Sequence, residues 1–282
     1  MFGLAGLLSL ALASGCNAQS VLHESNGPYG EVIVTQERDG LRTLRFERSG
    51  ARQTVVKPGD PAHLELAYAR SMTTGLALVD APARSLVVGL GGGSLPMFLR
   101  HYYPAMRIDA VDINPQVVDV ARRYFDFRED ALLRGIVADG RRFIEEAIPG
   151  SYDLILLDAF GANSVPKALT TQEFLQAVRR ALAPGGVVVG NVWGRGLNPI
   201  YDDMLRTYQE VFDETVVVSP GDYGNNLVIA LPRAIGLTQA TLAARAHALA
   251  AERGFRFDPG AAVKAGFVSL GERNPARRVL RD

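Results

Sequence analysis

The 282-residue sequence has almost no cysteine, few histidines and no net charge. Because Cys16 is the only cysteine, the fold cannot depend on internal disulfides. The four histidines are scattered, without the spacing or cysteine partners of a zinc site, so we expect no metal. Thirty basic residues balance thirty acidic ones, which favours neither nucleic acid nor an anionic membrane surface as a partner.

Long hydrophobic runs are also lacking. The apolar run at the start, residues 2–13, is well short of the ~20 residues that span a bilayer and suits the core of a signal peptide. It ends in Ala-Ser-Gly-Cys16, which resembles a bacterial lipobox whose cysteine is acylated after cleavage. We expect residues 1–18 to be a leader that directs the protein to the cell envelope, lipid-anchored or periplasmic. No lysine or arginine precedes the run, so a cytoplasmic location is the alternative.

The most informative stretch is 85–112. An apolar strand, 86–88, runs into a turn whose missing side chains allow a sharp bend and close approach of a ligand to the backbone. The next strand, 107–111, ends in Asp112, about 20 residues after the turn, where a carboxylate can accept both hydroxyls of a ribose. This order predicts a nucleoside pocket. The turn contains Gly89, Gly91, Gly92 and Gly93.

The dinucleotide fingerprint G-x-G-x-x-G/A is not met, because its last position is Ser94 or Pro96, so NAD is not favoured. Two later strands also end in acids, Asp139-Gly140 and Asp158, and a Pro-Gly-Gly turn precedes the strand 187–189. This order resembles the class I S-adenosylmethionine-dependent methyltransferase fold. The resemblance implies an α/β, Rossmann-like fold with a seven-stranded, mostly parallel sheet and helices on both faces. It also places Asp112 at the ribose and Asp139 near the adenine.

Four segments organise the chain, and hydrophobic residues at 48% suffice for a full core plus a small extra domain. After the leader, residues 19–80 hold alternating strands with Asp-Gly and Ser-Gly turns, which predict a small β-domain of hairpins, and then a helix near 63–76. The nucleoside-binding core is expected at 81–233. Residues 234–282 are expected to form a helix, 238–253, capped by Thr238, and an arginine-rich solvated tail.

Several further segments follow a recognisable pattern when they are taken together. They are Tyr29, Gln53-Thr54, YARSM at 68–72, GLGGGSLP, VDINP, ADGRRF, LLDAFGANSVP and LTTQEF. Over about residues 29–231 this pattern resembles the spermidine synthase family, and in particular its spermidine synthase-like domains. In that family decarboxylated S-adenosylmethionine supplies an aminopropyl group, and the aspartate matching Asp158 orients and deprotonates the attacking amine. The resemblance further implies that Gly140 and Gln53 contact the donor, whereas Tyr68, Asn163 and Tyr223 contact the acceptor.

Two family carboxylates are missing from the sequence. The acid that engages the donor's ammonium in the enzymes' GGGDGG turn aligns with Gly92, and the second acid of their D-x-x-D-P loop aligns with Gly161. Asn163, the nearest polar residue to Gly161, cannot replace a counter-charge, because hydrogen bonds between ionised partners are about twice as strong as neutral ones. We therefore expect weaker polyamine binding or a different amine.

Three functions stay open at this point. The first is an aminopropyltransferase in polyamine biosynthesis, acting on a small amine or polyamine. The second is a small-molecule methyltransferase that uses intact S-adenosylmethionine, and the third is an envelope lipoprotein that keeps the fold without catalysis. A hydrolase triad of Ser94, Asp158 and His247 is disfavoured, because Pro96 stands where the G-x-S-x-G elbow needs glycine. The sequence is compatible with a homodimer but does not fix the oligomeric state.

Overall fold

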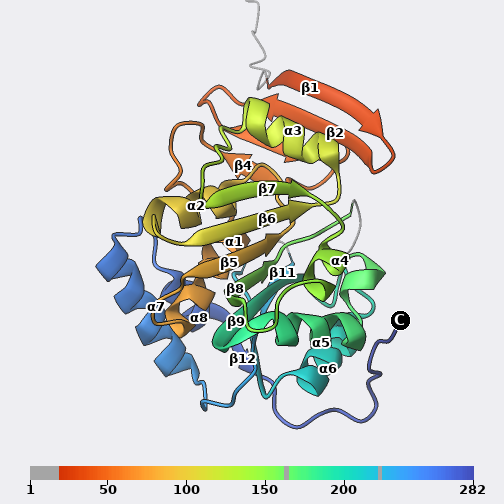
Figure 1. Ribbon diagram of the computed structural model, residues 1–282, viewed down its shortest axis with the longest axis vertical. Coiled ribbons are helices and arrows are strands. Elements are labelled where there is room, and N and C mark those ends of the chain that lie inside the picture. Colours follow the sequence, from red (N-terminus) through yellow and green to blue (C-terminus); the bar gives the residue numbers. More distant parts are fainter. Residues whose placement is uncertain (1–18, 162–164, 222–223) are drawn as a thin grey trace, which may run out of the picture.

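The computed structural model describes residues 19–161, 165–221 and 224–282. It has one large sheet covered by helices and a small antiparallel sheet at one end of the molecule (Figure 1). The predicted leader with Cys16, and the loop residues Asn163 and Tyr223, lie outside the described residues. The α/β architecture with a small N-terminal β-domain is as the sequence predicts.

The large sheet has eight strands in the order β12-β10-β11-β9-β8-β5-β6-β7. Strands β9, β8, β5, β6 and β7 are parallel, and β11, β10 and β12 continue the sheet through antiparallel pairs. The sequence predicts the first seven strands of this sheet in chain order, β5 to β11, and β12 is an eighth strand at the edge. In chain order the strands are β5 (Arg84–Val88), β6 (Arg107–Asp112), β7 (Leu133–Val137), β8 (Tyr152–Leu157), β9 (Leu182–Trp193), β10 (Glu214–Val218), β11 (Asn225–Leu231) and β12 (Phe267–Ser269).

Helices cover both faces of this sheet and bury two apolar clusters, one on each face. Thr238 accepts a hydrogen bond from the N–H of Thr241, which confirms it as the cap of α7. One face carries α1 (Ala67–Met72), the 3₁₀ helix η1 (Thr73–Leu78), α2 (Ser94–Tyr102), α3 (Pro115–Tyr124), α7 (Gln239–Arg253) and α8 (Pro259–Gly266). The other carries α4 (Gly140–Glu145), α5 (Gln172–Ala181) and α6 (Tyr201–Val211), with the short 3₁₀ helix η2 (Lys167–Leu169) before α5.

The small sheet has the order β1-β2-β3-β4 and packs against α3 (Figure 1). A third cluster of buried side chains lies between this sheet and the helix, and it joins Val32 and Val34 to Val117 and Val120. The sequence predicts three of these strands and misses β1, whose outer side is exposed and polar. The strands are β1 (Ser20–Gly27), β2 (Gly30–Gln36), β3 (Arg42–Arg45) and β4 (Thr54–Val56).

A buried ionic cluster crosses the parallel strands away from the carboxyl ends. Asp109 on β6 has no exposed surface and accepts hydrogen bonds from Arg134 at 2.5 Å, Arg84 at 3.2 Å and Tyr152 at 3.0 Å. Burial alone would raise the pKa of Asp109, but the bonds from these three partners outweigh it and lower that pKa below its usual range.

The C-terminal tail is exposed to solvent over residues 271–278, as the sequence leads us to expect, but it is also held against the core. Arg278 contacts Asp203 of α6, and the N–H of Leu280 donates to Thr207 at 3.0 Å. Asp282 receives two hydrogen bonds from Arg141, both at 2.6 Å. The four arginines of the tail pair with carboxylates of α5 and α6 while their side chains stay 48% to 81% exposed, so the tail lies along these helices at the surface.

No helix of the described segments is long and apolar enough to span a bilayer. In the same part of the chain, no group of three His, Cys, Asp or Glu side chains is arranged as metal ligands would be.

Candidate nucleoside-binding site

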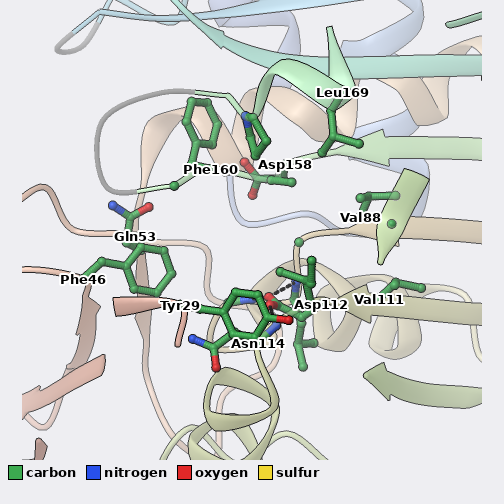
Figure 2. A pocket seen from close by; sticks show the side chains of 18 of the residues that line it. Tyr29, Phe46, Gln53, Val88, Val111, Asp112, Asn114, Asp158, Phe160 and Leu169 are labelled. Atoms are coloured by element: carbon green, nitrogen blue, oxygen red, sulfur yellow. Dashed lines mark hydrogen bonds between the residues drawn. The ribbon is translucent and has the colours of Figure 1, made fainter. Parts of the chain in front are cut away.

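A pocket of about 420 Å³ opens at the carboxyl ends of the parallel strands, where an open parallel sheet leaves its crevice. Its size lies within the range of small-molecule sites. Figure 2 shows two opposite sides of this pocket. Asp112 and Asn114 lie together on one side, and Asp158 faces them from below Phe160 and Leu169. Phe46 and Gln53 of the N-terminal segment close a third side.

The glycine turn forms the floor of the pocket. Gly89, Gly91 and Gly93 have positive φ angles of 98°, 53° and 80°, which side chains rarely adopt. A Cβ atom at Gly89 would lie 2.2 Å from the main-chain oxygen of Asp158. Only glycine therefore allows the ends of β5 and β8 to approach each other this closely. Gly89 and Gly91 line the pocket, whereas Gly93 lies behind it against Phe127.

Asp112 holds the turn in place as well as facing the pocket. Its Oδ2 accepts from the N–H groups of Leu90 at 3.1 Å and Gly91 at 3.4 Å, and its Oδ1 accepts from Asn114 at 2.9 Å. Burial raises the pKa of Asp112 even though these three bonds oppose the change. Oδ1 accepts one of these bonds, so it keeps a lone pair that can accept a hydrogen bond from a ribose.

Asp139 caps the next helix at the same edge of the pocket. Its Oδ1 accepts from the N–H groups of Arg141 at 2.8 Å and Arg142 at 3.1 Å, which fixes the start of α4. Asp139 and Gly140 both line the pocket, and Asp139 is exposed to it. The other oxygen of Asp139 is therefore available to an adenine amine.

Asp158, directly after β8, lies at the centre of a polar cluster. The side-chain amide of Asn191 donates to its Oδ1 at 2.8 Å, and the hydroxyl of Tyr68 also hydrogen-bonds to it. Tyr68 in addition donates to the main-chain oxygen of Gln53 at 3.0 Å. Burial raises the pKa of Asp158 to about 7, against the opposing effect of the Asn191 and Tyr68 bonds. A carboxyl group with that pKa can accept a proton near neutral pH.

The structure therefore brings together most of the residues that the sequence singles out, including Gln53, Tyr68 and Gly161. Ser94 also lines the pocket, but His247 hydrogen-bonds at 3.1 Å to Asp258, the N-cap of α8, so no hydrolase triad forms. Sequence reasoning missed Phe46, Asn114 and Asn191. Asn191 gives a related signal, because it is a polar residue directly after an apolar run, 187–190, and lies two residues before β9 ends.

Comparisons with known proteins agree with this geometry. A family model described as "Methyltransferase domain" matches residues 86–188. A polyamine aminopropyltransferase from Vibrio vulnificus is 34% identical over 237 residues, which cover 82% of this chain and 78% of the relative. The chain belongs to the polyamine aminopropyltransferase, or spermidine synthase, family.

Two solved structures share the fold of this family member, and one of them is also similar in sequence. A structure described as a probable spermidine synthase from Corynebacterium glutamicum superposes with a TM-score of 0.73 at 23% identity, covering 92% of this chain and 96% of that one. At that identity the match shows the fold. Human methyltransferase-like protein 13, solved in complex with SAH, matches with a TM-score of 0.60 at 32% identity, covering 68% of this chain and 93% of that one.

Proposed function

We propose that the protein is an aminopropyltransferase that moves an aminopropyl group from decarboxylated S-adenosylmethionine to a small amine, in polyamine biosynthesis. The observation that carries the proposal is Asp158, a carboxylate with a pKa raised to about 7 at the end of the nucleoside pocket. The name of the Vibrio vulnificus relative, polyamine aminopropyltransferase, supports the same reaction.

The donor's nucleoside would lie across the glycine turn. Its ribose hydroxyls would donate to Asp112, and its adenine amine would lie near Asp139, because both acids line the pocket beside that turn. Main-chain N–H groups already satisfy part of each carboxylate, which keeps both side chains in fixed positions before the donor binds.

Asp158 would supply the base. An ammonium acceptor gives one proton to Asp158, and the resulting amine attacks the carbon beside the donor's sulfonium. The new N–C bond forms as the C–S bond breaks. The electron pair of the C–S bond stays on sulfur, and methylthioadenosine is released. The positive charge passes from sulfur to the product amine, so the reaction needs neither a metal nor a covalent intermediate.

The decisive experiment measures two products side by side, methylthioadenosine and S-adenosylhomocysteine, with both donors and a broad amine panel. We expect methylthioadenosine, and turnover about 100- to 10,000-fold lower in Asp158→Asn, since general-base catalysis contributes on that scale. Calorimetry should find methylthioadenosine bound nearly as tightly by the variant. Unchanged turnover in Asp158→Asn would remove Asp158 from the mechanism.

A small-molecule methyltransferase is the second candidate, because Gly92 and Gly161 stand at both acidic positions of the family and a methyltransferase structure is 32% identical. Release of S-adenosylhomocysteine alone would favour it. If neither product appears, the non-catalytic envelope protein is favoured instead.

The location of the protein is a separate proposal, supported by the apolar run and Cys16 in the sequence. Expression in a bacterial host should give a membrane-associated species that becomes soluble on Cys16→Ser, because a lipid would supply the attachment. Mass spectrometry that finds Met1 intact and Cys16 unmodified in native material would exclude this route.

A further inference from the structure

Two asparagines from neighbouring strands form a chain of hydrogen bonds that ends on Asp158. Asn191 lies in β9 and is 4% exposed, and Asn225 begins β11, which pairs with β9. The side-chain amide of Asn225 donates to Oδ1 of Asn191 at 3.0 Å. Nδ2 of Asn191 in turn donates to Oδ1 of Asp158 at 2.8 Å.

The two contacts fix the orientation of the Asn191 amide. If this amide were turned over, its oxygen would face the Asp158 carboxylate, which has no proton to donate when ionised. Its NH₂ group would then face the NH₂ group of Asn225. Both contacts would be repulsive, so Asn225 ensures that Asn191 presents a donor to Asp158.

We propose that Asn191, oriented by Asn225, is a positioning residue that anchors the Asp158 carboxylate through a neutral amide. This inference rests on the proposed function. A cationic anchor such as arginine would fix the carboxylate equally well but would stabilise its charge and make it a poor base. An amide fixes the same oxygen while leaving the carboxylate uncompensated, so Asp158 keeps its affinity for a proton.

The groups that face Asp158 are few. Asn191 from β9 and Tyr68 from α1 are the side chains that hydrogen-bond to it among the described residues, and of the two only Tyr68 titrates. Asp112 faces Asp158 across the pocket, so the titration of Asp158 has to be read from its own carboxyl signal.

The test measures the titration of Asp158 directly by ¹³C NMR of protein labelled at aspartate carboxyls, with the signal assigned by its loss in Asp158→Asn. Asn191→Leu is nearly isosteric and removes the donor, so the apparent pKa should rise by about one pH unit. Asn225→Ala releases the Asn191 amide and should raise it by less. Asn226→Ala is the matched control: its amide contacts Ser219 instead, and the pKa should stay unchanged.

Turnover gives the second measurement. The acid limb of the kcat/KM profile should move to higher pH in Asn191→Leu and Asn225→Ala, so that activity lost at pH 7 is partly recovered at pH 9. A lower kcat with an unmoved limb and an unmoved carboxyl titration would overturn the proposal. If Asn191→Leu fails to fold, the less buried Asn225→Ala decides. If no amine is turned over at all, the proposed function fails, but the NMR titration still tests the anchoring of Asp158.

Discussion

The hydroxyl of Thr54 accepts a hydrogen bond from the backbone N–H of Gly92 at 3.0 Å. Thr54 belongs to β4 of the small sheet, and Gly92 belongs to the glycine turn of the core. Both groups are buried, so this bond joins the two sheets at the edge of the pocket.

Thr54→Val should lower the free energy of unfolding by about 1 to 3 kcal/mol, because it leaves the N–H of Gly92 buried without a partner. Urea unfolding measures this loss. The neighbouring strand offers a control, since the buried hydroxyl of Thr43 has no hydrogen-bond partner within the described structure. Thr43→Val should be neutral or stabilising, and an equal loss in both variants would contradict the role of Thr54.

Asp112→Asn should weaken methylthioadenosine binding by about 10-fold to over 100-fold, the cost of losing charge-assisted hydrogen bonds. Both oxygens of Asp112 accept main-chain N–H groups, so an amide in either orientation sets an NH₂ group against one of them. Stability should therefore fall as well. Asp139→Asn is the comparison, because asparagine caps a helix as well as aspartate does and only affinity should drop. Unchanged affinity in Asp112→Asn, measured by calorimetry, would contradict the proposal that Asp112 binds the ribose.

Asp158 should make stability fall as pH rises. Its pKa is about 7 in the folded protein and about 4 in the unfolded chain, so between these values the folded state holds a proton that the unfolded state has lost. Above about pH 4 the buried carboxyl group therefore costs folding free energy, and Asp158→Asn removes this cost. It should be more stable than the native protein by roughly 3 to 4 kcal/mol at pH 8, and by less than half of that at pH 5.

Asp109 should affect stability in the opposite way to Asp158, because its pKa is lowered in the folded protein. Its contribution is present above the unfolded pKa of about 4 and is lost only as pH falls through the lower folded value. Asp109→Asn should thus destabilise by about 3 to 5 kcal/mol, the cost of breaking a buried ion pair, and equally at pH 5 and pH 8. Denaturant unfolding of both variants at the two pH values checks the contrast, and a pH-independent difference for Asp158→Asn would refute it.

Putrescine should be a poor acceptor for the native protein, and Gly161→Asp should lower its KM by about 10-fold by restoring a counter-charge at the pocket wall. Gly161→Asn has the same size without the charge and should leave KM nearly unchanged. Gly92→Asp should not help the donor side, because a Cβ atom there would meet the ring of Phe125 and the methyl group of Thr54, both at 3.0 Å. Equal gains from Gly161→Asp and Gly161→Asn would show that charge is not the missing element.

The sequence predicts those parts of the fold that depend on local pattern. The strand expected at 152–157 is β8 (Tyr152–Leu157), and the acids at strand ends meet in one pocket because parallel strands end at the same edge. The helix expected at 63–76 becomes a short α1 followed by η1. A Cβ atom at Gly75 would lie 2.5 Å from Val189 of β9, so close contact with the sheet shapes η1, and no local signal reports it.

Side-chain partners between distant segments are the part that the sequence does not supply. The pairing of Asn225 with Asn191 depends on the register of β11 against β9. The attachment of Asp282 to Arg141 joins residues far apart in the chain. Periodicity describes which face of an element is buried, but it carries no information about which polar groups meet there.

The contact between Gly89 and the main chain of Asp158 limits what the glycine turn can say about function. Because the backbone leaves no room for a side chain at Gly89, that glycine is required by the scaffold whether or not a nucleoside is bound. The side chains around the acceptor are not constrained in this way and can change while the turn stays the same. The choice of transferred group and acceptor therefore depends on the residues opposite the turn.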